Sequence, residues 1–425
     1  MKLAQLSALS AAMILASAAQ ANEFMSDASF DIHLRNYFMD KTQEVGSTKD
    51  SNDQWSQAIS ANFSSGYFEN IIGVDLGMHY ALKLKADDLS AAGGVDADLL
   101  QTGADEVKPE SYGKTSYAVK VNLADMGTAR YGRLFLETPL LKNNYSRSLP
   151  GLTEAFHAEA SFEGIDLYGV WATKSNHRTE SGFSDFEVNG EKEEVKILGG
   201  GYDMGNGLTA DLAVGQQDEF ARKYFVDLGY AMDMQGASVD AGLVYGHNSL
   251  LGYTKDNRGA GVDDSQSVWG ATVKAGVQQA SFGLSYQKVS QSGITDSAGK
   301  NRFDKGWGGT QNDVNGFIGP HALMISDHRG DGQTSWGVHA GYDFAGMIDG
   351  LSLKLVYVDG ETDPQAGGKA DETEYNVTAA YAVPQVENLS VAARYAQNKT
   401  KVQSSGVETE NSQVRLIVKY DMSVF

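Results

Sequence analysis

The residues best placed to do chemistry are basic side chains around one proline-bounded segment. Arg133 precedes Pro139, Lys142 follows it, and Arg147 comes shortly before Pro150. Each proline stiffens the chain because its ring fixes one backbone angle. Guanidinium and ammonium groups on such a segment can bind anionic or hydroxyl-rich groups through charge-assisted hydrogen bonds. We therefore expect weak solute binding at this segment rather than a chemical reaction.

Other patterns that could carry catalysis or metal binding are incomplete. The glycines at 199–201 resemble a phosphate-binding loop, but no predicted helix follows them. His321 and His328 lack the spacing of a metal site. The tripeptide Arg329-Gly330-Asp331 resembles an adhesion motif, although so short a match is expected by chance. No nucleophile elbow is present. We predict that the protein is not an enzyme and binds no cofactor or metal ion.

The first 21 residues have the features of a secretory signal peptide. They contain an early lysine, a short apolar stretch and Ala19-Gln20-Ala21, which matches the A-x-A cleavage pattern. The apolar stretch is too short for a membrane-anchoring helix, and residues 22–425 contain no apolar run of about 18 residues. Fifty-five acidic side chains against 34 basic ones argue against nucleic-acid binding.

Strict alternation of apolar and polar residues dominates residues 22–425 and predicts β-strands. In residues 72–82, for example, apolar side chains hold the even positions, while Asp75 and His79 hold odd ones. This pattern predicts about 18 strands of roughly ten residues each. The predicted strands begin near Ser29, Gln54, Ile71, Ser116, Thr128, Ala155, Ile165, Glu194, Leu208, Ala221, Ala237, Gln266, Ala280, Thr334, Leu351, Glu372, Leu389 and Glu410.

The predicted connections alternate in length between two classes. Short ones, such as residues 163–164 and 278–279, interleave with long polar ones, such as 40–53, 138–154 and 290–333. Short turns on one rim and long loops on the other are typical of a transmembrane β-barrel. A loop that leaves and rejoins the wall, as 138–154 does, can fold inward and narrow the lumen.

A soluble all-β protein, such as a sandwich or propeller, is the alternative to a membrane barrel. Tyrosine, tryptophan and phenylalanine recur at the ends of the apolar faces, which favours interfacial girdles in a membrane. In hydrocarbon no sheet edge can remain unpaired, so the last strand must pair with the strand near Ser29. The predicted fold is an all-β, transmembrane antiparallel barrel with about 18 strands and an inward-folded constriction loop. Residues 22–425 are expected to form this single domain.

If the apolar positions face lipid, the opposite positions line a water-filled lumen. A charged side chain facing lipid at the midplane would cost about 2–4 kcal/mol, so this segregation is informative. Arg35 and Arg133 belong to the lumen set. A basic track for anionic groups is then predicted from Lys120, Lys274, Lys354, Arg394 and Arg415. Acidic residues on facing strands would create a transverse electric field.

Several short segments resemble the OprD (Occ) family of substrate-specific outer-membrane porins, which includes chitoporin-like members. They are Leu34-Arg35-Asn36-Tyr37-Phe38, Gln54-Trp55-Ser56-Gln57, Ser65-Gly66-Tyr67, Ile72-Gly73-Val74-Asp75, Gly132-Arg133, Pro139-Leu140-Leu141 and Arg147-Ser148-Leu149-Pro150. The last segment departs from the family pattern at Ser148, where a leucine is usual. The resemblance implies an 18-stranded barrel, a constriction built by the third loop, and a basic ladder. The resemblance also implies that Arg35, Arg133 and Arg147, which match the family pattern, are constriction residues.

These observations predict a porin in the outer membrane of a Gram-negative bacterium, exported by a cleaved signal peptide. Small polar or charged solutes (amino acids, carboxylates or oligosaccharides) would diffuse through a lumen narrowed by residues 138–154, with Arg35, Arg133, Lys142 and Arg147 at the constriction. A chitooligosaccharide channel and a plugged structural or adhesive barrel remain alternatives. The expected partners are small anionic or polar solutes, outer-membrane lipid and lipopolysaccharide, with no nucleic acid. A monomer and a loose homotrimer both fit the sequence. The sequence is also compatible with a lumen that prefers either anions or cations.

Overall fold

The protein forms a closed antiparallel β-barrel in the computed structural model. The structure describes residues 23–87, 94–102, 108–124, 126–296, 299–309, 314–317, 319–365 and 368–425. The predicted signal peptide, residues 1–21, lies outside these described residues. No helix among them is long or apolar enough to cross a membrane. The two described helices, α2 and α3, are single short turns at Glu23–Ser26 and Gly252–Asp256.

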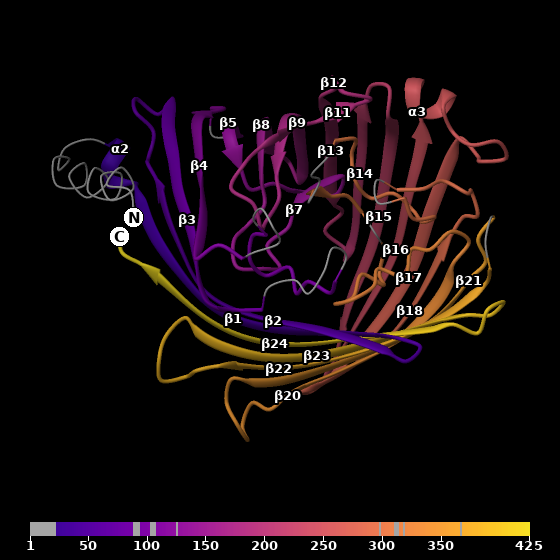
Figure 1. Cartoon of the computed structure of the whole chain (residues 1–425). Coiled ribbons are helices and arrows are strands. Elements are labelled where there is room, and N and C mark those ends of the chain that lie inside the picture. The colour runs from indigo at the N-terminus through magenta and orange to yellow at the C-terminus, as the bar shows by residue number, and fades with distance from the viewer. Residues whose placement is uncertain are drawn as a thin grey trace.

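Eighteen strands of the main sheet make the wall, and each pairs with the next in antiparallel register. The first and last strands pair with each other over Asp31–Val45 and Thr409–Ser423, which closes the ring (Figure 1). The wall strands are β1 (Ser29–Val45), β2 (Thr48–Ser64), β3 (Ile72–Ala86), β4 (Ser111–Asn122), β5 (Gly127–Leu134), β8 (Leu152–Phe162), β9 (Ile165–Asn176), β13 (Val195–Asp203), β14 (Leu208–Gln217), β15 (Ala221–Met234), β16 (Ala237–Leu250), β17 (Ser265–Val277), β18 (Ala280–Val289), β20 (Thr334–Asp343), β21 (Leu351–Thr362), β22 (Ala370–Ala382), β23 (Leu389–Val402) and β24 (Glu408–Ser423).

Every predicted strand corresponds to a wall strand, and most begin within three residues of the expected position. The largest differences are at β2, which begins at Thr48, and β4, which begins at Ser111. The predicted long connection 40–53 is wrong, because β1 and β2 continue as a polar ribbon to a tight turn at Gly46. Alternation in hydrophobicity ends at the membrane rim, whereas backbone pairing does not.

The outward face carries the apolar side chains and a belt of aromatic rings, as the alternation predicted. Leu198, Leu243 and Leu284 are between 55% and 65% exposed on this face. Neighbouring strands place aromatic rings in contact there, including Trp269 on Tyr286 with ring centroids 5.0 Å apart. The belt continues across the sheet through Tyr245, Trp336, Tyr357, Tyr375 and Tyr395. Rings at this level suit the boundary between lipid tails and headgroups.

Long connections fold into the barrel from one rim. Residues 135–151 carry the short hairpin of β6 (Glu137–Thr138) and β7 (Leu141–Asn143), which lies within the ring of strands (Figure 1). Residues 290–333 carry β19 (Val314–Asn315), which adds to β7 as a third strand. Residues 177–194 contain β10 (Ser184–Asp185), β11 (Glu187–Val188) and β12 (Glu191–Lys192). The inward constriction loop is therefore confirmed.

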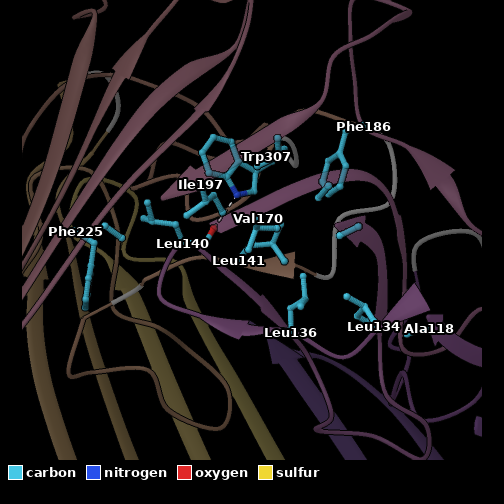
Figure 2. Packing of buried hydrophobic residues seen from close by; sticks show 14 residues of the cluster. Ala118, Leu134, Leu136, Leu140, Leu141, Val170, Phe186, Ile197, Phe225 and Trp307 are labelled. Carbon is cyan, nitrogen blue, oxygen red and sulfur yellow. Dashed lines mark hydrogen bonds between the residues drawn. The ribbon is translucent and has the colours of Figure 1, made fainter. Parts of the chain in front are cut away.

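The lumen is not uniformly polar, because the loops pack on part of the wall. Leu136, Leu140 and Leu141 of the constriction loop are at most 3% exposed. They form an apolar cluster with Trp307 and with wall residues (Figure 2). The inward-facing members of the wall are Val170, Ala172, Val195, Ile197, Ala213 and Phe225.

This cluster explains why alternation fades along β9 and β13. Those strands face lipid on one side and the packed loop on the other. Their outward-facing and inward-facing residues are therefore both apolar or small. Sheets covered on both faces carry near-continuous apolar runs for the same reason. The glycine at 199 leaves room for the side chain of Tyr168. A Cβ at Gly199 would lie 2.3 Å from the Tyr168 hydroxyl oxygen.

An arginine scan of β16 tests the two faces. Leu243 points to lipid and its neighbour Val244 lies on the lumen parity. We expect Leu243→Arg to lower the free energy of unfolding by about 2–4 kcal/mol, because its charge would lie in hydrocarbon. Val244→Arg, the matched control, should cost much less. Denaturant unfolding in liposomes measures both, and equal losses would contradict the assigned faces.

Candidate functional site

The constriction is built by residues 135–151 and stabilised by hydrogen bonds from distant parts of the chain. Trp307 donates its indole N–H to the carbonyl oxygen of Leu140 at 2.7 Å (Figure 2). Asn143 accepts from the backbone N–H of Leu136 at 2.8 Å and donates to Thr153 at 2.9 Å. These contacts fix a hairpin that would otherwise be too short to persist alone.

Arg35 attaches the constriction loop to β1. Its guanidinium donates to the carbonyl oxygens of Tyr145 and Arg147 at 3.1 and 2.5 Å. The same group stacks 3.8 Å from the centroid of the Tyr145 ring, a cation–π contact. Arg35 is 8% exposed. The side chain therefore positions the loop, and most of its donors are engaged.

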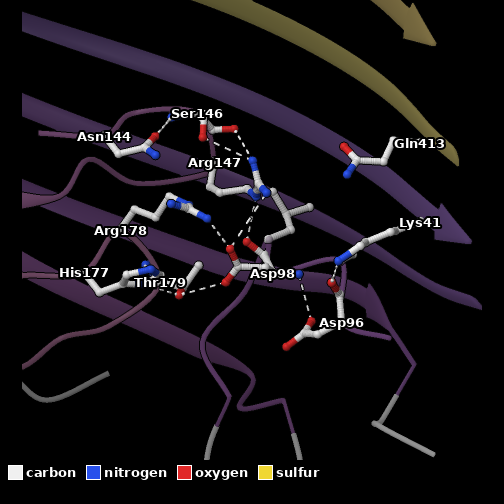
Figure 3. Close-up of polar contacts among 12 residues, drawn as sticks. Lys41, Asp96, Asp98, Asn144, Ser146, Arg147, His177, Arg178, Thr179 and Gln413 are labelled. Atoms are coloured by element: carbon white, nitrogen blue, oxygen red, sulfur yellow. Dashed lines mark hydrogen bonds and ion pairs between the residues drawn. The ribbon is translucent and has the colours of Figure 1, made fainter. Parts of the chain in front are cut away.

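Arg147, the second predicted constriction residue, belongs to a junction of three loops centred on Asp98 (Figure 3). Its Nε donates to the Asp98 carbonyl at 2.8 Å, and Nη2 lies 3.8 Å from the Asp98 carboxylate. Arg178 donates to that carboxylate from the next loop, and Thr179 adds a 3.3 Å contact. Residues 94–102, 135–151 and 177–194 thus meet at one carboxylate.

The charges of this junction stabilise each other. Burial alone would raise the pKa of Asp98, but Arg178 and Arg147 hold it below its ordinary value. Burial lowers the pKa of Arg147 to about 10, with Arg178 adding repulsion and Asp98 opposing both. All three groups stay charged near neutral pH, so the junction is an ion-paired structural element.

Basic residues on the wall hold the other loops by capping backbone carbonyls. Lys114 donates to the carbonyl oxygens of His177 and Arg178 at 2.6 and 3.3 Å. Lys223 binds the carbonyl of Asp304 at 2.9 Å and is 2% exposed. Arg415 donates to the carbonyl of Met324 at 2.9 Å. A buried carbonyl without a partner is costly, so these cations satisfy loop backbone that has no strand neighbour.

Two cavities flank Phe135 of the constriction loop. One, of about 550 Å³, is lined by Arg130 and the acidic residues Asp31, Asp75 and Glu159. The other, of about 500 Å³, is lined by Arg35, Lys419, His33, His79 and Tyr145. Both cavities share Asn62 and Ser116. Arg133 also lines the first cavity and Asp421 the second, so both have mixed charge, with an acidic excess in the first.

The strand register places Arg133 on the outward parity, unlike the sequence assignment, although Arg133 also lines the larger cavity. Its register partner is Tyr117, on the outward parity of β4, whereas Arg130 pairs with inward-facing Lys120. Arg133 lies 3.4 Å from Glu154, and its guanidinium carbon is 4.1 Å from the centroid of Phe183. The two arginines have opposite parity, and the local alternation is too short to decide which one points inward. Arg130 instead enters the lumen and pairs with Glu159 at 2.7 Å.

Lys142 lies on the hairpin and pairs with Glu137 at 3.0 Å, with both side chains more than half exposed. Lys120 pairs with Asp75 at 2.9 Å and is 6% exposed. Ion pairs therefore largely neutralise both of these predicted contacts. Neither carries a free charge toward a passing solute.

Three residues of the predicted basic track make no side-chain ion pair within the described part of the chain. Lys274, Lys354 and Arg394 all lie on the inward parity of β17, β21 and β23. Among the described residues, none of the three has a hydrogen bond or ion pair with another side chain. Lys419 of β24 joins them on the inward parity and lines the smaller cavity.

Acidic residues line the facing part of the wall. Asp211 and Asp227 are direct register partners on β14 and β15, and Asp166 and Asp240 lie inward on β9 and β16. None of the four has an ion-pair partner within the part of the chain that the structure describes. Because β14 lies half-way round the ring from β24, Asp211 faces the basic side, whereas Asp240 is the register partner of Lys274 on the adjacent strand.

Other predicted motifs have structural explanations. Within the described residues no group of three or more His, Cys, Asp or Glu side chains is arranged to hold a metal ion. Arg329 and Asp331 of the adhesion-like tripeptide are 6% and 1% exposed, so it is inaccessible to a receptor. Asp331 accepts from the backbone N–H groups of Ser292 and Gln365 at 2.7 and 2.8 Å.

Sequence reasoning missed Asp98, Lys114, Lys223 and Trp307. Inward parity marks Lys223, which immediately precedes outward-facing Tyr224 in a predicted strand. Lys114 lies in β4 but before the predicted start of that strand. Asp98 and Trp307 lie in loops, where no periodicity exists to identify them.

Replacing Asp98 tests the three-loop junction. Asp98→Asn keeps the shape but removes the charge, which leaves Arg147 and Arg178 partly buried without a carboxylate. We expect the three loops to be destabilised by about 1–3 kcal/mol while the barrel stays folded. Limited proteolysis and hydrogen exchange of residues 94–102 and 177–181 measure this. Asp256→Asn in exposed α3 is the control, and equal protection in both variants would contradict the junction.

Comparison with known proteins identifies the family. A model described as "outer membrane porin, OprD family" matches residues 22–424. The chain is 25% identical to Porin D of Pseudomonas aeruginosa over 96% of this chain and 93% of that protein. It is 23% identical to Porin-like protein GalP of Pseudomonas putida, over 96% and 94% of the two chains. The crystal structure of Pseudomonas aeruginosa OpdK with vanillate aligns at a TM-score of 0.77 and 22% identity, over 94% of this chain and 100% of that one. Because the family model covers nearly the whole chain, this protein belongs to the OprD family of outer-membrane porins.

Proposed function

We propose that this outer-membrane porin selects small anionic or polar solutes during passive diffusion across the outer membrane of a Gram-negative bacterium. Solutes would pass the constriction formed by residues 135–151, next to Phe135 and Tyr145. The observation that carries the proposal is the separation of free charges on the lumen wall. Bases occupy β21, β23 and β24, and acids occupy β9, β14 and β15, while the two groups meet where Lys274 of β17 pairs in register with Asp240 of β16.

The free bases are the proposed solute contacts. Lys354, Arg394 and Lys419 have inward positions and no competing ion pair. A carboxylate crossing the lumen can move between them, because contacts to several water-exposed cations are each weak enough to release it. The facing acids repel the anion toward the basic side. OpdK was crystallised with vanillate, an aromatic carboxylate, and this supports the same solute class for a chain with this fold.

The predicted constriction contacts take different parts in this proposal. Arg35, Arg147 and Arg415 position the loops, since their donors bind loop carbonyls. Arg133 and Lys142 are assigned no solute contact, because each is already ion-paired, with Glu154 and Glu137 respectively. Lys274 extends the basic side of the wall.

The family match bears on the alternative functions. The relatives reported above are OprD-family porins and a similar porin-like protein, so we do not adopt the chitooligosaccharide alternative. A porin family favours a channel over a structural or adhesive barrel, and over an enzyme. Contact with lipopolysaccharide, and assembly as a monomer or loose homotrimer, stay predictions.

Conductance in planar bilayers tests the pore. Purified protein should give discrete ion-current steps, because charged side chains line both cavities. Liposome swelling with amino acids, carboxylates and chitooligosaccharides should then rank carboxylates first. A barrel that keeps its heat-modifiable gel mobility but passes no current would reject the proposal.

Neutralising one free base tests the charge assignment. We expect Arg394→Gln to lower the anion-to-cation permeability ratio by up to about fivefold, because a unit charge near a passing ion contributes about 1 kcal/mol in water. Lys399→Gln on the same strand is the control, since Lys399 has outward parity and pairs with Glu408 at 2.8 Å. Reversal potentials across a salt gradient measure the ratio. An equal shift in both variants would reject Arg394 as a solute contact.

A further inference from the structure

Two fully buried histidines lie in one inward loop outside the constriction. Residues 320–333, named here the histidine segment, lie against the inner faces of β18, β20 and β22. His321 and His328 are both 0% exposed. Their rings meet edge to face with centroids 6.1 Å apart. The solute contacts proposed above use neither residue.

Hydrogen bonds to the wall hold the histidine segment in the lumen. Glu374 of β22 accepts from the backbone N–H groups of Ile325 and Ser326 at 3.0 and 2.8 Å. Gln287 of β18 donates to the carbonyl of His328 at 2.6 Å and accepts from the N–H of His321 at 3.1 Å. Glu374 and Gln287 are both fully buried. The segment therefore covers inward positions of the wall that would otherwise be wet.

The segment is also coupled to the constriction. Asp327 pairs with Lys305 at 2.7 Å, and this lysine lies two residues before Trp307. Trp307 in turn holds the constriction hairpin through Leu140. Movement of residues 320–333 away from the wall would therefore release a contact that shapes the narrowest part of the lumen.

The surroundings of the two rings suit neutral imidazoles. His321 makes one hydrogen bond from each ring nitrogen, to Ser335 at 2.7 Å and to Ser285 at 2.8 Å. A neutral ring offers one donor and one acceptor, and a serine hydroxyl can match either. His328 has no hydrogen-bond partner on either ring nitrogen, and Glu372 lies 3.5 Å from Nδ1. Its backbone φ of 45° is a left-handed conformation that surrounding contacts must maintain.

We propose that the histidine segment is an acid-sensitive gate, which covers the wall while His321 and His328 are neutral and leaves it when they gain protons. This inference rests on the proposed pore function. Two protonated rings would place positive charges about 6 Å apart in a site without water. Release of the segment would return both rings to solvent. The lumen would then widen, and the constriction hairpin would lose its Lys305–Asp327 support.

The charged neighbours do not cancel the cost of burial. Burial lowers the pKa of His321 to about 3, and His328 and His339 add repulsion. Burial also lowers the pKa of His328, although nearby carboxylates oppose the shift. The groups facing the two rings are Glu372 and Glu374 on β22, Asp359 on β21, His339 on β20, and Asp327 on the segment itself.

The direction of the pH effect follows from these shifts. A released histidine has a pKa of about 6.5, so the open segment binds more protons than the closed one below that value. The covered state therefore loses stability as pH falls below about 6.5, and goes on losing it down to the lower pKa of the buried rings. Between about pH 7.5 and 5.5, release of His321 should raise the open-to-closed ratio about tenfold, and release of His328 should act in the same direction.

Single-channel recording of the full-length protein tests the gate. At about pH 5.5 we expect more time in a larger-conductance state than at about pH 7.5. The double variant His321→Gln/His328→Asn should lose this response and keep the current measured at neutral pH. Asparagine is chosen at 328 because it tolerates positive φ. His247→Gln is the control, since His247 has outward parity on β16, lies 3.1 Å from the Ser249 hydroxyl and lines neither cavity.

A labelling experiment separates movement from a change in ion selectivity. The chain has no cysteine, so Ser326→Cys introduces a single reporter on the half-buried segment. Its reaction with a water-soluble methanethiosulfonate should accelerate in acid relative to Ser405→Cys on an exposed turn. A current that does not change with pH, or an acid response that survives in the double variant, would overturn the gate. Absence of any current at either pH would instead reject the pore.

Discussion

Backbone groups inside a membrane have no water to bind, and this constraint determines the rest of the structure. Every wall strand therefore pairs on both sides, and the pairing of β1 with β24 removes the last free edge. Closure gives each residue one of two directions, lipid or lumen. Once the register is set, the direction of every wall side chain follows from its position in the strand.

The lumen then requires a second kind of stabilisation, because its loops have no continuous apolar core. Basic side chains supply much of it by donating to loop carbonyls, as Lys114, Lys223 and Arg415 do. The Asp98 junction performs the same task with charge pairs. The basic residues of this barrel thus divide into loop anchors and free wall charges. A count of inward-facing cations would overstate how many are available to a solute.

The loops also change what the wall needs. Where residues 135–151 pack, inward positions such as Val170, Ile197 and Phe225 are apolar, and the barrel has a small core inside its lumen. This departs from the expectation of a polar interior throughout. The two cavities survive beside that core because Asn62, Ser116 and their neighbours keep the remaining wall polar. The core and the larger cavity share Ala118, Leu134 and Leu136, so packed and open regions adjoin within one ring.

The sequence alone determined the strands, their order and their two faces, because alternation is a local property with a period of two residues. It also located Lys274, Lys354 and Arg394 on the lumen side. It placed Arg130 and Arg133 on opposite parities but could not decide which one points inward, because the local alternation is too short. Only the tertiary structure decided which cations are free, because Asp98, Tyr145 and Met324 contact their arginines across 49, 110 and 91 residues of sequence. Loop contacts of that range leave no periodic trace in a chain, and the folded lumen is what brings them together.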